Sequence, residues 1–342
     1  MTQPKIALLY GRVDPSAPAD EADTFVQVNA VRSALHGLGY PLIDVPVSLD
    51  LGVAAAVLKA ARPVLAFNLV ESIHGRGSLI HLAPSLLDSM GITYTGAPCE
   101  AIMLTSHKLL GKKTLAAAGI DTPPWMTASD ALRGAPPFPP PWIVKSVWEH
   151  ASIGLADSSV AGSETELSAE TRRRAANEPI EQLFVEGFIE GREFNLALLA
   201  PAEEGEPESL PAAEILFLGY PEGKPKVVGY RAKWEQGSFE FENTPRRFDF
   251  PAEDVEMVGR LNRLSRECWR AFGLRGYARV DFRVDGAGRP WILEINTNPC
   301  LSPDAGFLAA AQRAGLTIEE VVRRIVVEAT RRAFPDAGER IL

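Results

Sequence analysis

The chain has 342 residues, of which 46% are hydrophobic and 23% charged, and its formal net charge is −9. This length predicts two or three domains, and the composition argues against long disorder and a disulfide scaffold. An acidic chain without a basic block argues against nucleic acid as the main partner. No apolar run approaches the roughly 18 residues that span a bilayer. The three cysteines form no C-x-x-C pair, so we expect a cytoplasmic protein that acts on small molecules.

The first third of the chain alternates predicted strands with predicted helices. Two of the helical stretches end at glycine, the usual residue just after a helix C-terminus. Strands that alternate with helices pair in parallel, so we expect a parallel α/β sheet here. Strands are expected at 5–10, 41–47 and 64–70, and a strand and turn at 92–97. Helices are expected at about 23–38, between the second and third strands, and at 82–91.

The pattern becomes antiparallel from Arg192 onward. The proline-rich residues 122–141 are expected to form a loop or linker, and 277–296 to form a hairpin. Further strands are expected at 141–147, 181–191, 192–200 and 212–219, with a loop at 201–211 and helices at 106–119, between the first two of these strands, at 252–272 and at 318–333. The simplest division is three modules, 1–104, 105–191 and 192–342.

The hairpin carries the most informative pattern. Because side chains alternate along a strand, Arg279, Asp281 and Arg283 share one face, with Val280, Phe282 and Val284 on the other. On the second strand Glu294 and Asn296 share a face, opposite Trp291, Leu293 and Ile295. A turn centred between Ala287 and Gly288 places Asp281 opposite Glu294 and Arg279 opposite Asn296.

This register brings two carboxylates and an amide oxygen together. Carboxylates directly opposite each other repel, so a cation is expected between them. Oxygen ligands of this kind suit Mg²⁺, which is usually held by one or two carboxylates and nucleotide phosphates. The alternative is an exposed, solvated face of charged residues, and the spacing alone leaves both interpretations open.

Lysines in the expected modules favour a phosphate site. A lone lysine is usually solvated, but Lys145 follows the apolar run WIV, and Lys108 and Lys233 also lie near a strand or at a helix start. Three lysines, a carboxylate pair and the segment EGFIEGRE together predict a triphosphate site.

Several segments, in order, resemble a known family. FNLVESIHGRG, GITYTG and HKLLGKKTLAAAGIDTPPW are followed by EGFIEGREF, YRAKW, GYARVDFRVD and LEINTNP. Over residues 5–333 the chain resembles the ATP-grasp carboxylate–amine ligases, and especially the D-alanine–D-alanine ligases. The resemblance implies an α/β fold, α+β in its C-terminal half, with an N-terminal Rossmann-like substrate domain, a small central ATP-grasp subdomain and a C-terminal ATP-grasp domain with a metal site and lid. It also implies a homodimer and a reaction in which ATP converts a carboxylate to an acyl phosphate that an amine attacks.

The resemblance also implies roles for single residues. Arg279 neutralises charge during phosphoryl transfer, and Lys233 reaches the γ-phosphate from a mobile lid. Two Mg²⁺ ions are expected, with Mn²⁺ as an alternative. The implied phosphate ligands are Lys108 and Lys145, at the α- and β-phosphates, and Ser152 in the loop after the strand lysine is a further implied ATP ligand. Glu186, Phe188 and Ile189 are implied at the adenine and Glu193 at the ribose. The implied metal ligands are Asp281, Glu294 and Asn296.

The departures from the family lie around the substrates. Ala151 and Ala305 stand where the family has serines, Trp234 replaces a tyrosine, Cys300 replaces a glycine, and a Gly-Glu-Asp-Gly run is missing after HGRG. Losing polar anchors usually changes the substrate, so we expect a product other than D-alanyl-D-alanine. Candidate substrate contacts are His74, His150, Trp234, Cys300 and Asp304, with Glu21 or Asp23 as an acid for a substrate amine. For Cys300 the alternative is a structural residue in a tight turn, and for His150 a partly exposed loop residue. Arg246 and Arg247 either close the lid or are solvated, and we favour the second.

Three functions remain open at this stage. The first is an ATP-dependent ligase that joins amino acids or a small peptide and releases ADP and phosphate. The second is a true D-alanine–D-alanine ligase with a changed pocket, and the third is a nucleotide-binding protein without ligase activity. Arg279 argues against the third, because nucleotide binding alone does not require it.

Overall fold

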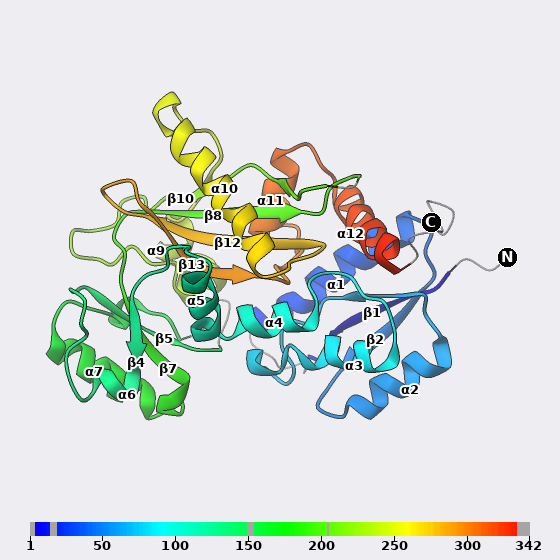
Figure 1. Cartoon of the computed structure of the whole chain (residues 1–342), viewed down its shortest axis with the longest axis horizontal. Helices are drawn as coiled ribbons and strands as arrows, with labels where there is room; N and C mark the ends of the chain where they lie inside the picture. Colours follow the sequence, from blue (N-terminus) through cyan, green and yellow to red (C-terminus); the bar gives the residue numbers. More distant parts are fainter. Residues whose placement is uncertain (1–3, 14–18, 149–153, 204, 334–342) are drawn as a thin grey trace.

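The computed structural model describes residues 4–13, 19–148, 154–203 and 205–333, and their strands form three sheets (Figure 1). The first contains β1 (Ile6–Gly11), β2 (Leu42–Val47) and β3 (Leu65–Asn68), which are parallel in the order β2-β1-β3. This confirms the predicted parallel sheet. The segment expected as a strand at 92–97 makes only a bridge between Ala66 and Tyr94.

Helices cover both faces of the parallel sheet. They are α1 (Ala19–Gly37), α2 (Leu51–Ala61) and α3 (Leu82–Met90). Alternate residues of β1 enter two separate cores: Ile6 and Leu8 pack in the core that contains α1, and Ala7 and Leu9 in the core that contains α2 and α3. Burial on both faces explains why β1 and β3 read as continuous apolar runs. α3 ends at Gly91, whose φ of +64° suits glycine.

The central sheet is antiparallel, in the order β4-β7-β5-β6. The expectation that residues 122–141 form a loop is wrong, because this segment contains the strand β4 and the short helix α6. β4 is held by pairing with β7, a contact between segments far apart in the chain that local composition does not reveal. The elements are β4 (Trp125–Thr127), α6 (Ala128–Ala131), β5 (Trp142–Ser146), β6 (Val160–Ala161), α7 (Glu164–Ala175) and β7 (Leu183–Gly187).

The C-terminal sheet is antiparallel, in the order β11-β10-β8-β12-β13 with β9 beside β8. Its apolar face packs on α10 (Val255–Ala271), α4 (Cys99–Ser106) and α5 (Lys108–Ala117). The expected loop at 201–211 contains the short strand β9, and the strand expected at 212–219 is shorter. The strands are β8 (Arg192–Leu199), β9 (Glu208–Ser209), β10 (Ala213–Ile215), β11 (Arg246–Arg247), β12 (Tyr277–Val284) and β13 (Pro290–Asn296).

The β12–β13 hairpin contains a β-bulge. Asp281 pairs with Glu294 and Arg279 with Asn296, as the sequence predicts, but Phe282 pairs with Ile292, which leaves Leu293 as an extra residue. The bulge changes which residues face the core, so the expectation that Trp291, Leu293 and Ile295 share one face is wrong. Ile292 and Ile295 are the two that are buried in the core against α10.

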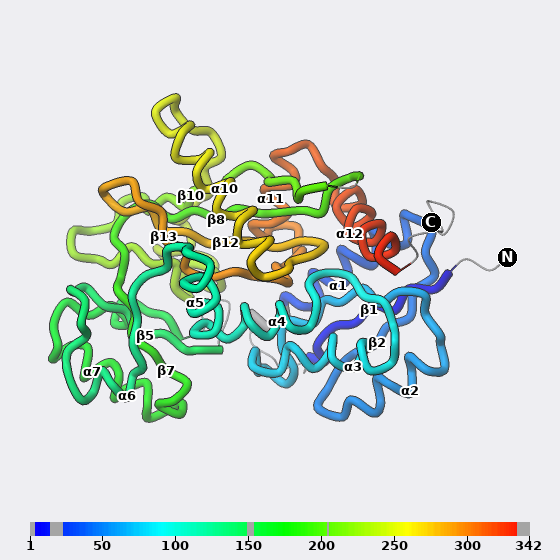
Figure 2. The backbone as a smooth tube through the Cα atoms, in the orientation of Figure 1, coloured from blue at the N-terminus to red at the C-terminus, as the bar shows by residue number. Residues whose placement is uncertain are grey.

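The last two helices return to the N-terminal sheet. α11 (Gly306–Arg313) and α12 (Ile318–Ala333) join the core formed by α1, β1 and β3, and the tube in Figure 2 shows α12 beside the start of the chain. Each sheet lies within one of the ranges 1–104, 105–191 and 192–342, but two cores cross these boundaries. The division into modules therefore stays a prediction. No helix in the described residues has the length and apolar character needed to cross a membrane.

Candidate functional site

Asp281 is the centre of a polar cluster on the face of the C-terminal sheet that is opposite α10. Its two carboxylate oxygens accept hydrogen bonds of 2.8 Å from Nε and Nη2 of Arg279. Asn195 donates to it at 2.7 Å and Asn296 at 3.1 Å. Burial acts to lower the pKa of Arg279, but the Asp281 carboxylate outweighs it and raises that pKa above its ordinary value. The guanidinium therefore stays charged at the centre of the site.

Glu294 lies opposite Asp281 and has its own cation. The Nζ of Lys108, the first residue of α5, is 3.7 Å from Oε2 of Glu294. The backbone N–H of Lys108 donates to the carbonyl of Val147 at 3.0 Å, which ties the start of α5 to the end of β5. Asp281 is only 7% exposed, so this cluster differs from a solvated face. The cation expected near the carboxylate pair is supplied by two side chains from different elements.

The hairpin supplies part of the ligand set that a divalent metal ion requires. Within the described ranges, no three His, Cys, Asp or Glu side chains are grouped to hold a metal. Asp281 and Glu294 instead supply two carboxylates on paired residues, and Asn296 adds an amide oxygen. Such a set does not fit an all-protein cage, but it fits a hard divalent ion that takes its other ligands from phosphates and water.

On the central sheet, Glu186 joins two lysines. Its Oε1 is 2.7 Å from Nζ of Lys145 and its Oε2 is 2.5 Å from Nζ of Lys112. Burial acts to raise the pKa of Glu186, but the two ammonium groups outweigh it and lower that pKa below its ordinary value. Burial lowers the pKa of Lys112, although Glu186 opposes this. Both oxygens of Glu186 are thus engaged by lysines, and its expected role at the adenine stays a prediction.

The connection from β7 to β8 carries the other expected nucleotide residues. Phe188 and Ile189 are half-buried, and the Phe188 ring centre is 5.5 Å from Cζ of Arg283. Arg283 is 3% exposed, and its Nη2 is 2.7 Å from Oε2 of Glu193. The carboxylate expected at the ribose is therefore held in place by a buried guanidinium.

Lys233 lies on the short helix α8 (Tyr230–Trp234). Burial and the nearby Arg279 guanidinium lower its pKa, while the carboxylates of Glu294, Asp281 and Glu193 act to raise it. Lys233 therefore shares the electrostatic environment of the hairpin cluster. Trp234, the last residue of α8, is half-buried. The structure thus brings Lys233, Lys108 and Arg279 to the hairpin, with Lys145 on the central sheet.

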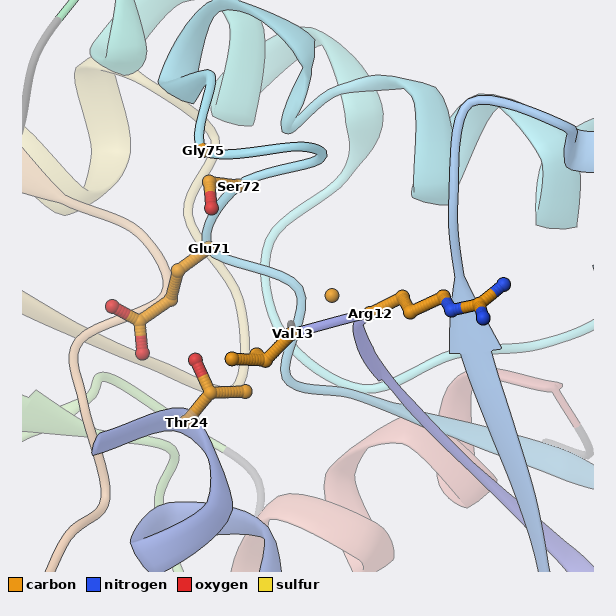
Figure 3. Close-up of a pocket in the computed structure, with 7 residues that line it drawn as sticks. Arg12, Val13, Thr24, Glu71, Ser72 and Gly75 are labelled. Carbon is orange, nitrogen blue, oxygen red and sulfur yellow. The ribbon is translucent and has the colours of Figure 1, made fainter. Parts of the chain in front are cut away.

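A second polar group comes from the N-terminal sheet. Glu71 follows β3 and accepts a 2.6 Å hydrogen bond from Gln27, whose Oε1 accepts one of 2.8 Å from the backbone N–H of Leu301. Glu71 is exposed at the pocket, but the surrounding protein desolvates its carboxylate and raises its pKa to about 7; Gln27 and Arg279 act to lower the pKa and Asp23 to raise it. Figure 3 shows Glu71 in a polar pocket, with its carboxylate and the Thr24 side chain on the same side and Arg12 extending away from them.

The predicted substrate residues lie in three different settings. Asp23 accepts hydrogen bonds from the Cys300 thiol at 3.1 Å and the Ser302 hydroxyl at 2.9 Å. Burial raises the pKa of Cys300 well above its ordinary value, so the thiol stays neutral. His74 is exposed, with a φ of +55°, and Asp304 is exposed near the start of α11. His150, Ser152 and the side chain of Glu21 lie outside the described residues.

The sequence interpretation missed two residues of this site, Lys112 and Glu71. Lys112 is four residues after Lys108, a spacing that places both on one side of α5. Glu71 follows the carboxyl end of a parallel strand, the edge where ligands bind in open α/β sheets. Both residues lie within segments that carry the family resemblance, FNLVESIHGRG and HKLLGKKTLAAAGIDTPPW, but the sequence interpretation assigned neither of them a role.

A central antiparallel sheet that carries Lys145, and a second antiparallel sheet whose carboxylate hairpin is contacted by Lys108 of α5, are typical of an ATP-grasp enzyme, and comparison with known proteins agrees. The profile of the D-ala D-ala ligase C-terminus matches residues 117–327. A D-alanine–D-alanine ligase of Gloeobacter violaceus is 29% identical over 94% of this chain and 98% of its own length. D-alanine–D-alanine ligase B of Pseudomonas putida is 30% identical over 95% and 92%. The D-alanine–D-alanine ligase of Bacillus anthracis is 21% identical, covers 97% of this chain and 99% of its own, and has a TM-score of 0.71.

The chain belongs to the D-alanine–D-alanine ligase family. This confirms the resemblance seen in the sequence and the α/β ATP-grasp fold class. The protein is an ATP-dependent carboxylate–amine ligase, and enzymes of this family use ATP and a divalent metal. The alternative of a nucleotide-binding protein without ligase activity is therefore excluded.

Proposed function

We propose that this ligase joins the carboxylate of an amino acid or small peptide to the amine of a second amino acid, and that its main product is not D-alanyl-D-alanine. The observation that carries the proposal is the cluster at the hairpin, where Lys108 and Arg279 each neutralise one of two paired carboxylates. This cluster suits phosphoryl transfer to a substrate carboxylate, because that reaction is catalysed by positioning and by charge neutralisation.

The protein groups have separable roles in this reaction. Lys108 and Lys145 bind the α- and β-phosphates, and Lys233 binds the γ-phosphate from α8. Asp281, Glu294 and Asn296 would hold the divalent metal, which we expect to be two Mg²⁺ ions with Mn²⁺ as a substitute and which supplies charge neutralisation at the phosphates. Arg279 stabilises the charge on the transferring phosphoryl group, and the incoming amine then displaces phosphate from the acyl phosphate. No enzyme nucleophile is needed.

The substrate side of the site supports a changed specificity. Trp234 adds bulk beside Lys233, and Ala305 provides no hydroxyl at the start of α11. Asp23 and Glu71 place two carboxylates where a substrate ammonium group could bind, and Asp23 is bonded by Cys300 and Ser302. D-alanyl-D-alanine synthesis is the second candidate, and the similarity to D-alanine–D-alanine ligases of other organisms favours it.

A phosphate-release screen of the purified protein tests this proposal. The protein is incubated with Mg-ATP and pairs of amino acids of both chiralities, and released phosphate and ADP are measured. The proposal predicts that at least one pair exceeds D-alanine alone by tenfold or more, a difference that a change of one or two buried polar contacts can produce. Turnover with D-alanine alone that matches the best pair would establish the second candidate instead. We also propose a cytoplasmic homodimer, which light scattering of the purified protein tests.

A further inference from the structure

Glu71 comes from the N-terminal sheet but is tied to the β12–β13 hairpin. The hydroxyl of Tyr277 donates to Oδ1 of Asn298 at 2.6 Å, and Nδ2 of Asn298 donates to the backbone carbonyl of Val70 at 2.9 Å. Tyr277 lies two residues before Arg279 on β12, so these two side chains share one face of the strand. The residue that precedes Glu71 is therefore connected to the strand and to the face that carry Arg279.

The carboxylate of Glu71 has one oxygen that is open to a ligand. Its Oε1 accepts the 2.6 Å hydrogen bond from Gln27, and Gln27 is itself held by the backbone N–H of Leu301 at 2.8 Å. Within the described part of the chain, no second side chain donates a hydrogen bond to this carboxylate. The side chain is exposed at the pocket, on the same side as Thr24 (Figure 3). A ligand in the pocket can therefore reach Oε2 of Glu71.

The neighbours of Glu71 make it the available proton acceptor of this pocket. The ionisable side chains that line the pocket or lie near the carboxylate come from several segments: Arg12 after β1, Asp23 on α1, Tyr277 and Arg279 on β12, and Cys300 after β13. Both oxygens of Asp23 already accept hydrogen bonds. Burial raises the pKa of the Tyr277 hydroxyl and of the Cys300 thiol well above their ordinary values, so both groups stay neutral. Arg279 stays protonated, so Glu71 is the group here that has an oxygen free to take a proton.

The second step of the reaction requires such an acceptor. An ammonium group has no lone pair, so the amine substrate must lose a proton before it attacks an acyl phosphate. Desolvation raises the pKa of Glu71 to about 7, which is closer to the pKa of an ammonium group than an ordinary carboxyl is. Proton transfer to Glu71 is therefore less unfavourable than transfer to an unperturbed carboxylate. A perturbed carboxylate in a cleft is also a common mark of a functional group.

We propose that Glu71 is the proton acceptor for the amine substrate of this ligase. The proposal rests on the proposed function and assigns a residue to its second step. Oε2 of Glu71 takes one proton from the substrate ammonium group, which frees the lone pair of the nitrogen. The C–N bond then forms while the C–O bond of the acyl phosphate breaks, and phosphate leaves with the electron pair of that bond and with the second N–H proton. Glu71 afterwards returns its proton to solvent, to which the pocket is open.

The Glu71→Gln variant tests this role, because glutamine keeps an acceptor for Gln27 but takes no proton. With Mg-ATP and the amino-acid pair of highest turnover, D-alanine included, kcat for amide formation should fall by about 100-fold or more. Hydroxylamine is uncharged at pH 7 and needs no acceptor, so hydroxamate formation from the same acid should change by less than about threefold. Glu100→Gln, at an exposed position on α4, is the matched control and should change neither rate. Equal losses of amide and hydroxamate, or no loss of amide, would overturn the proposal.

The pH dependence of the two reactions gives a second arm. In the wild-type protein, kcat for amide formation should rise with pH and level off above about pH 7, since only the carboxylate form of Glu71 accepts a proton. Glu71→Gln should lack this rise, Glu71→Asp should restore part of the turnover, and hydroxamate formation should show no such rise in any of the proteins. A rise near pH 7 that persists in Glu71→Gln would assign the proton acceptor to another group.

A measurement without turnover separates this inference from the proposed function. In protein labelled with ¹³C at its glutamate carboxyls, NMR identifies the signal of Glu71 as the one that is missing from Glu71→Gln. This signal should titrate near pH 7, whether or not any amino-acid pair gives turnover. Titration near the ordinary value of 4.5 would overturn the assignment. D-Alanyl-D-alanine as the main product, with the expected behaviour of Glu71, would overturn the proposed substrate and leave the proton acceptor in place.

Discussion

At the scale of single residues, Arg279 is the charged group that interacts with most of the other charged side chains of the site. It neutralises Asp281 through two hydrogen bonds of 2.8 Å, and its charge also acts on Lys233, Arg246 and Glu71. We expect Arg279 to stabilise the transition state of phosphoryl transfer more than it stabilises bound ATP. The reason is that negative charge develops on the oxygens of the transferring group as the reaction proceeds.

The Arg279→Ala variant separates these two effects. We expect ATP binding within about threefold of wild type and a loss of phosphate release of about 100- to 1,000-fold. Nucleotide titration and the phosphate assay measure the two quantities. Arg289→Ala is the control, because Arg289 lies on the same hairpin but forms an exposed ion pair with Asp121. Loss of ATP binding in parallel with activity would contradict the catalytic role.

Glu71 gives a pH-dependent prediction. Its pKa is raised from 4.5 to about 7, so between these values the folded protein keeps a proton that the unfolded chain has lost. Stability contributed by this group therefore falls as the pH rises from about 4.5 to 7 and is constant above that. Urea unfolding at pH 5 and pH 8 should show a larger decrease for wild type than for Glu71→Gln, which cannot titrate. Parallel decreases in both proteins would show that Glu71 is not perturbed.

At this scale the sequence predicted the residues to which strand alternation or the family resemblance assigns a role. The hairpin residues Asp281 and Glu294 were placed opposite each other by alternation and turn position, and the structure agrees. Lys112 and Glu71 were not found, because their importance comes from contacts with Glu186 and Gln27, which are distant in the chain. A pattern in one segment carries no information about such partners.

At the scale of elements, a chain of polar contacts joins the central sheet to the hairpin. Lys112 on α5 is 2.5 Å from Oε2 of Glu186 on β7, and it donates to the Thr122 hydroxyl at 2.8 Å. That hydroxyl donates at 2.8 Å to the carbonyl of Ile292 on β13. Since Glu186 also holds Lys145, the position of the phosphate-binding lysine depends on these contacts.

The Lys112→Met variant tests this connection. It leaves one buried oxygen of Glu186 without its cation, so the free energy of unfolding should fall by about 3 kcal/mol. The KM of ATP should also rise. Lys112 and Lys145 both contact Glu186, so without Lys112 the carboxylate is free to shift and no longer holds Lys145 in place. Urea unfolding and ATP kinetics provide the measurements, and adding Glu186→Gln should recover part of the stability. If Lys112→Met alone is as stable as wild type, the ion pair between Lys112 and Glu186 contributes little to the free energy of unfolding.

The longer strands could be predicted from the sequence, and the shortest strands could not. In the parallel sheet, β1 and β3 are buried runs of six and four residues, while the six residues of β2 are only partly buried. Alternation with helices predicted the pairing of all three strands. β4 and β9 have three and two residues, too few for a local pattern, and each exists through pairing with a longer strand. The bulge at Leu293 was also missed, and it reverses the expected position of Trp291, whose indole instead donates to Asp285 at 2.9 Å.

At the scale of the whole molecule, packing joins parts that the sequence separates. α12 completes the core around α1 and β1, and α4 packs against the C-terminal sheet. Net charge is similarly a poor guide to the site. A chain of net charge −9 still gathers Lys108, Lys233 and Arg279 near one hairpin, so a polyanion can bind where local charge differs from the total.

Isotope transfer from the substrate carboxylate to phosphate tests the central claim most directly. The phosphate-release screen is repeated with amino acids that carry ¹⁸O in their carboxylates, and the released phosphate is analysed by mass spectrometry. An acyl phosphate attacked by an amine predicts one ¹⁸O atom in each phosphate, together with an amide product other than D-alanyl-D-alanine. Unlabelled phosphate would contradict the acyl phosphate, and D-alanyl-D-alanine as the main product would contradict the proposed change of substrate.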